Sequence, residues 1–388
     1  MSQLKVNTIR HTGASSDNIT LASDGTATAK ITNISNRNLV INGSMQVWQR
    51  STSSLTSGYG TVDRWKDTAG NIGQNATKSR GTLSSSDGPW ADGHKYYHRK
   101  TLAGAGNANS NAEVSLETVL ESQDIANSGW SYKSSSSYIT LSFWARVSTG
   151  QTFYMYVYNP DSGYVYLKDF ALSSNTWTKV SYSIPGNSNL VFDLNEGAGL
   201  QLRILQFYGT GYTNNRSTES WATYAGTNFA PDMASTWLTA GASTFDLTGV
   251  QLEVGDYATD FEHRSYGDEL ARCQRYYYAH ISALDSSNST LGLGMYYSSS
   301  RAMMYVKFPV SMRTTPTAEI TDVSNGYQLW VGGTYDFVDE FHIDTTNAGS
   351  VNGCELESDS EASGTTGYSC YVRRYTADTK QFSFSAEL

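Results

Sequence analysis

Aromatic side chains gather in the middle of the chain, where their types suit contact with a sugar ring. The run FYMYVY places Tyr154, Tyr156 and Tyr158 on one face of an expected strand, and Trp144 lies on the strand YITLSFWARV before it. Together they would form an aromatic platform, whose flat faces suit the apolar face of a sugar. The same residue types are enriched where subunits meet. Both interpretations stay open, and we favour subunit contact.

A second aromatic group lies toward the end of the chain, in loops rich in Tyr, Ser, Asn and Gly. These loops are MYYSSSR, SNGYQLWVGGTY and SGTTGYS. Adaptable polar residues beside rigid aromatic anchors are the composition that binding loops use. Tyr327, Trp330 and Tyr335 are the residues that we expect to contact a glycan, although Trp330 also suits a core position.

Candidate catalytic groups are few. Asp336, Asp339 and Glu340 in DFVDEF could serve glycoside hydrolysis, which needs two acids roughly 5–10 Å apart. Such groups arise by chance in a chain with 36 acidic residues. The six histidines are scattered, and HExxH, GxSxG, a phosphate loop and the repeats of a β-helix are all absent from the sequence. We therefore predict that the protein is not an enzyme and uses no cofactor.

The composition narrows the class of partner. Charged residues make up 16% of the chain and the net charge is −9. A negative protein is unsuited to nucleic acid and to anionic membranes. No apolar run is long enough to insert into a bilayer, and the first residues lack the apolar core of a signal peptide. These features predict a product of a cytoplasm that binds neither nucleic acid nor membranes.

The cysteines Cys273, Cys354 and Cys370 are three in number and form no CxxC motif. An odd count without that motif is a poor disulfide framework and a poor zinc site. Buried free thiols are the expectation, while a bond between Cys354 and Cys370 remains an alternative.

Alternating apolar residues predict an all-β fold with few helices. Residues 38–262 are expected to form a jelly-roll β-sandwich, in which the alternation slips by one residue at Gly249, as at a β-bulge. AEVSLETVLES, residues 112–122, fits a helix or a strand, and we choose the strand. Residues 263–278 form the one good helix, with Ser265 as its N-cap. Residues 279–388 then form a smaller β-sandwich, the C-terminal tip.

Residues 1–37 are polar and cannot bury a core of their own. Three parallel copies around an axis could bury Leu4, Val6 and Ile9 together. We therefore expect a homotrimer in which this segment serves trimerisation and attachment.

Two segments about 200 residues apart carry a resemblance to a known family. They read NLVINGSMQVWQR with DRW at 63–65, and GVQLEVGDYATDFEHRSYGDELARCQRYY from residue 249. As a set they resemble the two ends of a carbohydrate-binding-like jelly-roll module in bacteriophage tail fibres and related receptor-binding virion proteins. MYYSSSRAMMYVKFPV resembles the segment on the C-terminal side of this module in such fibres.

The resemblance implies a homotrimeric virion fibre made in the host cytoplasm. Its N-terminus would bind other virion proteins of the tail or capsid, and multivalent adhesion would attach it to host-surface glycans. A head fibre or capsid decoration protein is the first alternative, and a polysaccharide depolymerase is the second.

NLVINGSM also resembles carbohydrate-binding jelly rolls that hold a structural calcium ion. An acidic residue commonly follows the opening strand in those proteins, whereas Gln46 stands there in this chain. Calcium prefers several oxygen ligands, often carboxylates. We therefore predict no metal site, and Asp246 on the closing strand is the single candidate calcium ligand.

Overall fold

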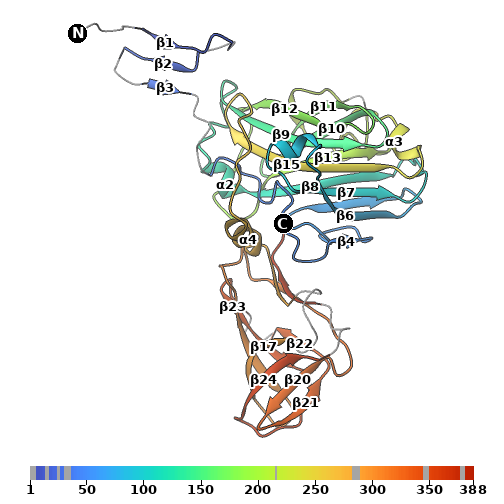
Figure 1. Ribbon diagram of the computed structural model, residues 1–388, viewed down its shortest axis with the longest axis vertical. Coiled ribbons are helices and arrows are strands. Elements are labelled where there is room, and N and C mark those ends of the chain that lie inside the picture. The colour runs from blue at the N-terminus through green and yellow to red at the C-terminus, as the bar shows by residue number, and fades with distance from the viewer. Residues whose placement is uncertain are drawn as a thin grey trace. The chain divides into compact units, whose positions relative to one another are not determined.

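The computed structural model describes residues 6–13, 17–23, 27–29, 36–214, 216–281, 289–343, 349–375 and 381–388. The chain divides into two compact units, Met1–Arg37 and Asn38–Leu388. Strands dominate both units (Figure 1), so the protein is all-β, as the alternation predicted.

The first unit is a small antiparallel sheet of β1 (Thr8–Ile9), β2 (Ile19–Leu21) and β3 (Ala27–Ala29). Val6 and Ile9 are exposed on this unit, as expected of a segment without its own core. Leu4 lies outside the described residues. Burial of these side chains between copies, and the homotrimer with it, stays a prediction.

Residues 38–262, the jelly roll, contain two antiparallel sheets of six strands each. The strands of the first sheet are β5 (Lys66–Gly70), β8 (Glu113–Glu121), β10 (Gln151–Asn159), β11 (Tyr164–Leu172), β13 (Ala198–Tyr208) and β14 (Trp221–Thr223). Those of the second are β4 (Ser53–Ser54), β6 (Ala76–Thr82), β7 (Tyr96–Leu102), β9 (Tyr138–Val147), β12 (Thr178–Pro185) and β15 (Thr244–Val254). Three short helices, α1 (Gly88–Ala91), α2 (Ser122–Ala126) and α3 (Thr236–Thr239), lie in the connections.

The two sheets run in the orders β14-β11-β10-β13-β8-β5 and β12-β9-β15-β7-β6-β4. Phe143 of β9 and Phe153 of β10 belong to one buried cluster, which shows that the sheets pack face to face. The alternation fixes which side chains point inward, since neighbouring residues of a strand point to opposite faces. Residues 112–122 are indeed a strand for most of their length, and their helical spacing was misleading.

A β-bulge interrupts β15 where the alternation predicted one. The pairing of β15 with β9 shifts between Thr248 and Gln251, and Gly249 between them has a φ of +64°. Glycine adopts this left-handed conformation without strain. The bulge restores the inward direction of Val250 and Leu252, both fully buried.

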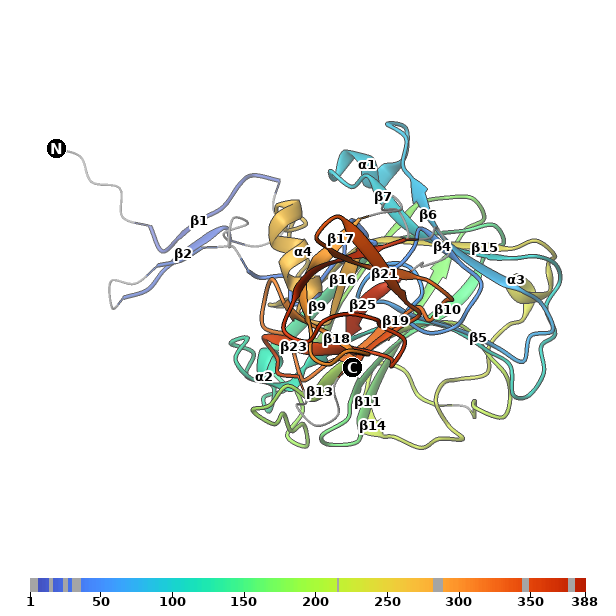
Figure 2. The same cartoon turned by 90° about the horizontal axis from the view of Figure 1, so that it is seen from below.

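The predicted helix is present as α4 (Tyr266–Gln274), which leads into β16 (Tyr277–Ile281) (Figure 2). The Ser265 hydroxyl accepts a hydrogen bond from the Asp268 backbone NH at 3.1 Å, which confirms Ser265 as its N-cap. Among the described residues no helix is long and apolar enough to cross a membrane.

The tip forms a second two-layer unit. It begins with β16 at Tyr277, two residues before the start expected from the sequence. One layer joins β17 (Thr290–Tyr296), β18 (Ala302–Lys307), β20 (Tyr327–Val331), β21 (Thr334–Val338), β22 (Phe341–Ile343), β23 (Gly353–Ser358) and β24 (Ser369–Arg374). The strand order in this seven-stranded sheet is β21-β20-β24-β17-β18-β23-β22. The other layer pairs β16, β25 (Phe382–Ser385) and β19 (Thr317–Ile320). A shared apolar core lies between the layers.

All three cysteines are free and buried. Cys354 lies on β23 and Cys370 on β24, and two other strands separate these in the sheet. Because neighbouring strands are about 4.8 Å apart, the two thiols are too distant for a disulfide bond. Burial raises the pKa of Cys354 to about 12 and that of Cys370 to about 11, so both stay protonated and unreactive.

The last residues of the tip return to the jelly roll and hold the two together. Glu387 forms ion pairs with Arg64 and with Arg50, the latter at 3.3 Å. The Arg64 guanidinium lies 3.4 Å from the centre of the Tyr276 ring. Glu121 of β8 accepts hydrogen bonds from Arg275 at 2.7 and 2.8 Å. These buried charges tie the jelly roll to the start and the end of the tip.

Candidate functional site

A groove with a volume of about 380 Å³ opens along the edge strand β21 of the tip. It is bounded by the β20–β21 hairpin, the end of β17 and the loop that precedes β24. The lining residues are Tyr296, Leu329, Val331, Gly332, Thr334, Tyr335, Asp336, Ser363, Gly364, Thr365 and Tyr368. The three loops that the sequence singled out therefore converge on one groove.

The hairpin turn determines which residues face the groove. Gly332 and Gly333 have φ values of +58° and +90°, and Val331 pairs with Thr334 across them. Positive φ at both central residues is typical of the tight two-residue turn that joins antiparallel strands. This turn fixes the register that pairs Leu329 with Asp336 on the core side, where the groove lies.

The opposite wall is held in place by backbone hydrogen bonds. The Gly367 NH donates to the Tyr296 carbonyl at 2.8 Å, and the Tyr296 NH donates to the Tyr368 carbonyl at 2.9 Å. A Cβ atom at Gly364 would lie 2.1 Å from the Tyr296 ring, so only glycine allows this close approach. The groove is therefore preformed, which lowers the entropic cost of binding a ligand.

Asp336 supplies the charge of the groove. Its carboxylate accepts a hydrogen bond from the Ser363 backbone NH, and no described cation pairs with it. Burial, and after it the Asp336 charge, raises the pKa of Tyr296 to about 12, so this phenol stays protonated. Tyr368 is more than half exposed, whereas the ring of Tyr335 lies on the outer face of the sheet beside Trp330. The groove thus offers aromatic surfaces, hydroxyls and one carboxylate acceptor.

The predicted binding residues of this region have different positions. Tyr335 pairs with Trp330 across the hairpin, so both side chains lie on the outer face of the sheet, and Tyr335 reaches the groove only at its edge. The rings of Trp330 and Tyr335 have centroids 5.3 Å apart, and the Arg373 guanidinium lies 4.8 Å from the Trp330 centroid. Tyr296, Asp336 and Tyr368 were not named from the sequence as ligand contacts. The loop composition was the only signal for them.

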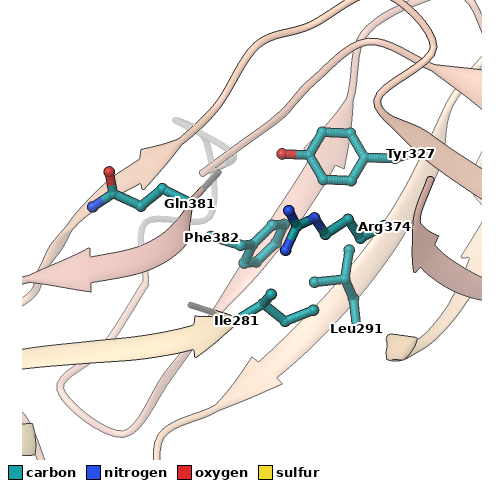
Figure 3. A pocket seen from close by; sticks show the side chains of 6 residues that line it. All are labelled: Ile281, Leu291, Tyr327, Arg374, Gln381 and Phe382. Carbon is teal, nitrogen blue, oxygen red and sulfur yellow. The ribbon is translucent and has the colours of Figure 1, made fainter. Parts of the chain in front are cut away.

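Tyr327 requires a correction, because it is fully buried. Its hydroxyl donates to the Thr321 carbonyl at 2.8 Å. The ring lines an internal space with Ile281, Leu291, Arg374, Gln381 and Phe382 (Figure 3), and this space is too small for a water molecule. Tyr327 therefore supports the core and is closed to a ligand.

The aromatic platform expected in the jelly roll is also wrong. Trp144 lies on β9 of one sheet, whereas Tyr154 and Tyr156 lie on β10 of the other, each pointing away from the shared core. Tyr156 is buried beneath the segment that contains Tyr212 and Phe229. The Trp144 indole NH donates to Asp92 at 2.9 Å. These side chains cannot present one surface, because two sheets lie between them.

Asp246 cannot serve as a calcium ligand. Its carboxylate is almost fully buried and is paired with Arg99 at 2.7 Å and with Arg146 at 2.8 Å. Two guanidinium groups already neutralise it and occupy its oxygens. The residue joins β15 to β7 and β9, where these arginines lie.

The acids of DFVDEF separate in the fold. Asp336 faces the groove, whereas Asp339 lies with Asp359 and Glu361, their nearest oxygens within 4.8 Å of one another. Burial and then the Asp339 charge raise the pKa of Asp359. No sequence motif marks this trio, since its members come from two separate segments of the chain.

No family model matches the chain, and no curated protein matches it. Among solved structures it is similar to the enzymatically active domain of tailspike protein 4 of bacteriophage CBA120. The identity is 10%, the TM-score 0.29, and the match covers 56% of this chain but only 21% of that one. A putative sugar-binding protein from Bacteroides thetaiotaomicron matches with 11% identity, TM-score 0.30, and coverage of 56% and 100%.

A family 11 carbohydrate-binding module from Clostridium thermocellum matches with 11% identity and a TM-score of 0.25. The match covers 54% of this chain and 98% of that one. At these TM-scores the likeness carries no argument about what this chain binds.

Proposed function

We propose that this protein is a virion fibre that attaches to host-surface glycans, and that the groove of the tip is its contact site. The observation that carries this proposal is the convergence of Tyr296 and Tyr368 with Asp336 in one preformed groove. Tyrosine rings offer surfaces for the apolar face of a sugar. The carboxylate and the lining hydroxyls of Thr334, Ser363 and Thr365 suit the sugar's own hydroxyls.

The charge of the groove favours one class of glycan. Asp336 has no described cationic partner, so it would repel a uronic or sialic acid carboxylate and accept hydrogen bonds from neutral sugars. An amino sugar with a free ammonium group would gain an additional ion pair. Neutral or amino sugars are the expected ligands.

We propose binding without hydrolysis. Asp336 is the sole acid among the residues that line the groove. Glycoside hydrolysis ordinarily requires two carboxyl groups on opposite sides of the scissile bond. Incubation with host polysaccharide should release no reducing ends, and release of such ends would favour the depolymerase alternative.

The N-terminal segment would supply attachment to the particle and association into a homotrimer. Several weak sites presented together increase avidity by about 10² to 10⁴ without any new contact. Residues 38–388 without this segment should still bind glycan but should no longer join particles. Incorporation of the truncated protein into virions would contradict this assignment.

A panel of neutral, amino and acidic glycans tests the groove. Asp336→Asn and Tyr368→Ala should each weaken binding roughly 10-fold or more, because hydrogen bonds to charged groups contribute about 1.5–3 kcal/mol. Tyr297→Ala is the matched control, since Tyr297 is 62% exposed and does not line the groove. Equal binding by all three variants and the wild type would overturn the site, and binding to no glycan would overturn the function.

A further inference from the structure

The seven-stranded sheet of the tip has an outer face that none of the described residues cover. Its inner face packs against the layer of β16, β25 and β19. The outer face carries a row of apolar side chains from adjacent strands, which we call the outer apolar face. Its members are Trp330, Tyr371, Leu293, Met295, Met303 and Tyr305.

The strand register places these side chains next to one another. Trp330 pairs with Tyr371, Tyr371 with Leu293, and Met295 with Met303. Leu293 is 67% exposed, Tyr305 60% and Tyr371 54%. Since large side chains bury about 150–250 Å² each, their exposed parts with Met295 offer roughly 400–500 Å² of apolar surface. This equals the largest apolar patch of a typical monomer.

The composition of this face suits a protein partner. Met, aromatic residues and Arg are enriched in the centres of protein interfaces. Leu293 and Met295, at the middle of the row, offer no flat ring on which a sugar could stack. The apolar area is about half of the 800 Å² or so that each partner buries in a standard interface. Flanking polar side chains would supply the rest.

The charges beside the row suit a second copy of the same chain. Arg373 lies on β24 and Glu355 on β23, on the two sides of the central strands β17 and β18. Both point outward, and no ion pair joins either of them to another described residue. The β24 side of the outer apolar face therefore carries a positive charge, and the β23 side carries a negative charge.

We propose that the outer apolar face binds the same face of a second copy, about a two-fold axis that runs between β17 and β18. This axis exchanges the two central strands, so Leu293 of each copy meets Tyr305 of the other. It also exchanges β24 with β23, which brings Glu355 of each copy opposite Tyr371 of the other, and the long Arg373 side chain, two residues along β24, can reach Glu355 from there. Two twisted sheets pack in this way with their strands about 30° apart. The groove opens on the core side of the sheet and stays accessible.

Charge reversal tests the pairing directly. In Arg373→Glu alone, and in Glu355→Arg alone, like charges meet at both ends of the interface. Each variant should therefore dissociate at a concentration at least about tenfold above that of the wild type. An equimolar mixture of the two variants restores opposite charges at both ends, and it should associate as tightly as the wild type. Native mass measured over a dilution series of residues 38–388, a compact unit without the proposed trimerisation segment, gives these midpoints.

Two leucine variants provide the second test. Leu293→Glu should shift the dissociation midpoint at least as far as the charge reversals. Leu194→Glu is the control, because Leu194 is 77% exposed on the jelly roll, and it should leave the midpoint unchanged. A protein of residues 38–388 that is monomeric at micromolar concentration, unshifted midpoints, or a mixture that stays dissociated would each overturn the proposal. These outcomes leave glycan binding at the groove unaffected.

Discussion

The jelly roll and the tip use their aromatic residues in opposite ways. In the tip, Tyr297, Tyr305, Tyr335, Tyr368 and Tyr371 are each more than half exposed. Among the described tyrosines of the jelly roll, only Tyr224 is exposed, at 37%, and the others are buried or half-buried. Yet both have complete apolar cores. The two regions therefore differ in how many aromatic side chains their surfaces leave exposed for contact with other molecules.

Interactions within the jelly roll occupy even its outward-facing aromatics. Trp177 donates to Asp87 at 3.0 Å, and the Arg146 guanidinium lies 4.6 Å from the Trp177 ring centroid. Such contacts stabilise the sheet and leave few ring faces for a ligand. In our account the jelly roll therefore serves as a scaffold, whereas the tip carries the binding surfaces.

The largest expected effect on stability comes from a substitution in the jelly roll. Asp67 of β5 is buried and contacts His98 at 2.9 Å and Lys100 at 3.0 Å, both from β7 of the facing sheet. Asp67→Ala leaves the Lys100 charge buried without its partner, which should lower the free energy of unfolding by about 3–5 kcal/mol. Chemical denaturation measures this. Asp336→Ala in the tip is the control and should change stability by no more than about 0.5 kcal/mol.

The second largest expected effect is a dependence of stability on pH. Burial raises the pKa of Asp63 to about 6, against the opposing effects of Arg50 and Gln49. A carboxyl with a raised folded-state pKa contributes stability below its unfolded pKa and loses it as the pH rises through about 6. Asp63→Asn should therefore gain about 2–3 kcal/mol of unfolding free energy relative to the wild type between pH 4 and pH 7. A constant difference across that range would contradict the assignment.

The connection between scaffold and tip gives a smaller effect. Glu387→Ala removes the acidic partner of Arg64, which is buried. Loss of a charged hydrogen bond should lower the free energy of unfolding by about 2 kcal/mol. Thermal unfolding checks this, with Glu196→Ala as the control because Glu196 is exposed and its carboxylate has no ion pair among the described residues. Equal stability of both variants would mean that Glu387 does not hold the jelly roll and the tip together.

The smallest effects on stability should come from the exposed tyrosines of both regions. Tyr368→Ala in the tip and Tyr224→Ala in the jelly roll should each change stability by about 0.5 kcal/mol or less. Only the tip variant should reduce glycan binding. Reduced binding by Tyr224→Ala alone would reverse the comparison and assign recognition to the jelly roll.

Local pattern predicted more of the fold than of the site. Alternation located the strands, Gly249 marked the bulge, and Ser265 marked the helix start. In YQLWV both faces of the strand carry large side chains, so alternation could not show that Tyr327 points inward and Trp330 outward. Which strands become neighbours depends on pairing between distant segments. For that reason Trp144 could not be separated from Tyr154, nor Arg99 and Arg146 matched to Asp246, from the sequence.

The central claim, that glycan is held in the groove of the tip, is tested most directly by oxidative footprinting with and without bound glycan. Our account predicts protection of Tyr368, with unchanged oxidation of Tyr297 and Tyr224. Protection of Tyr224 without protection of Tyr368 would contradict it.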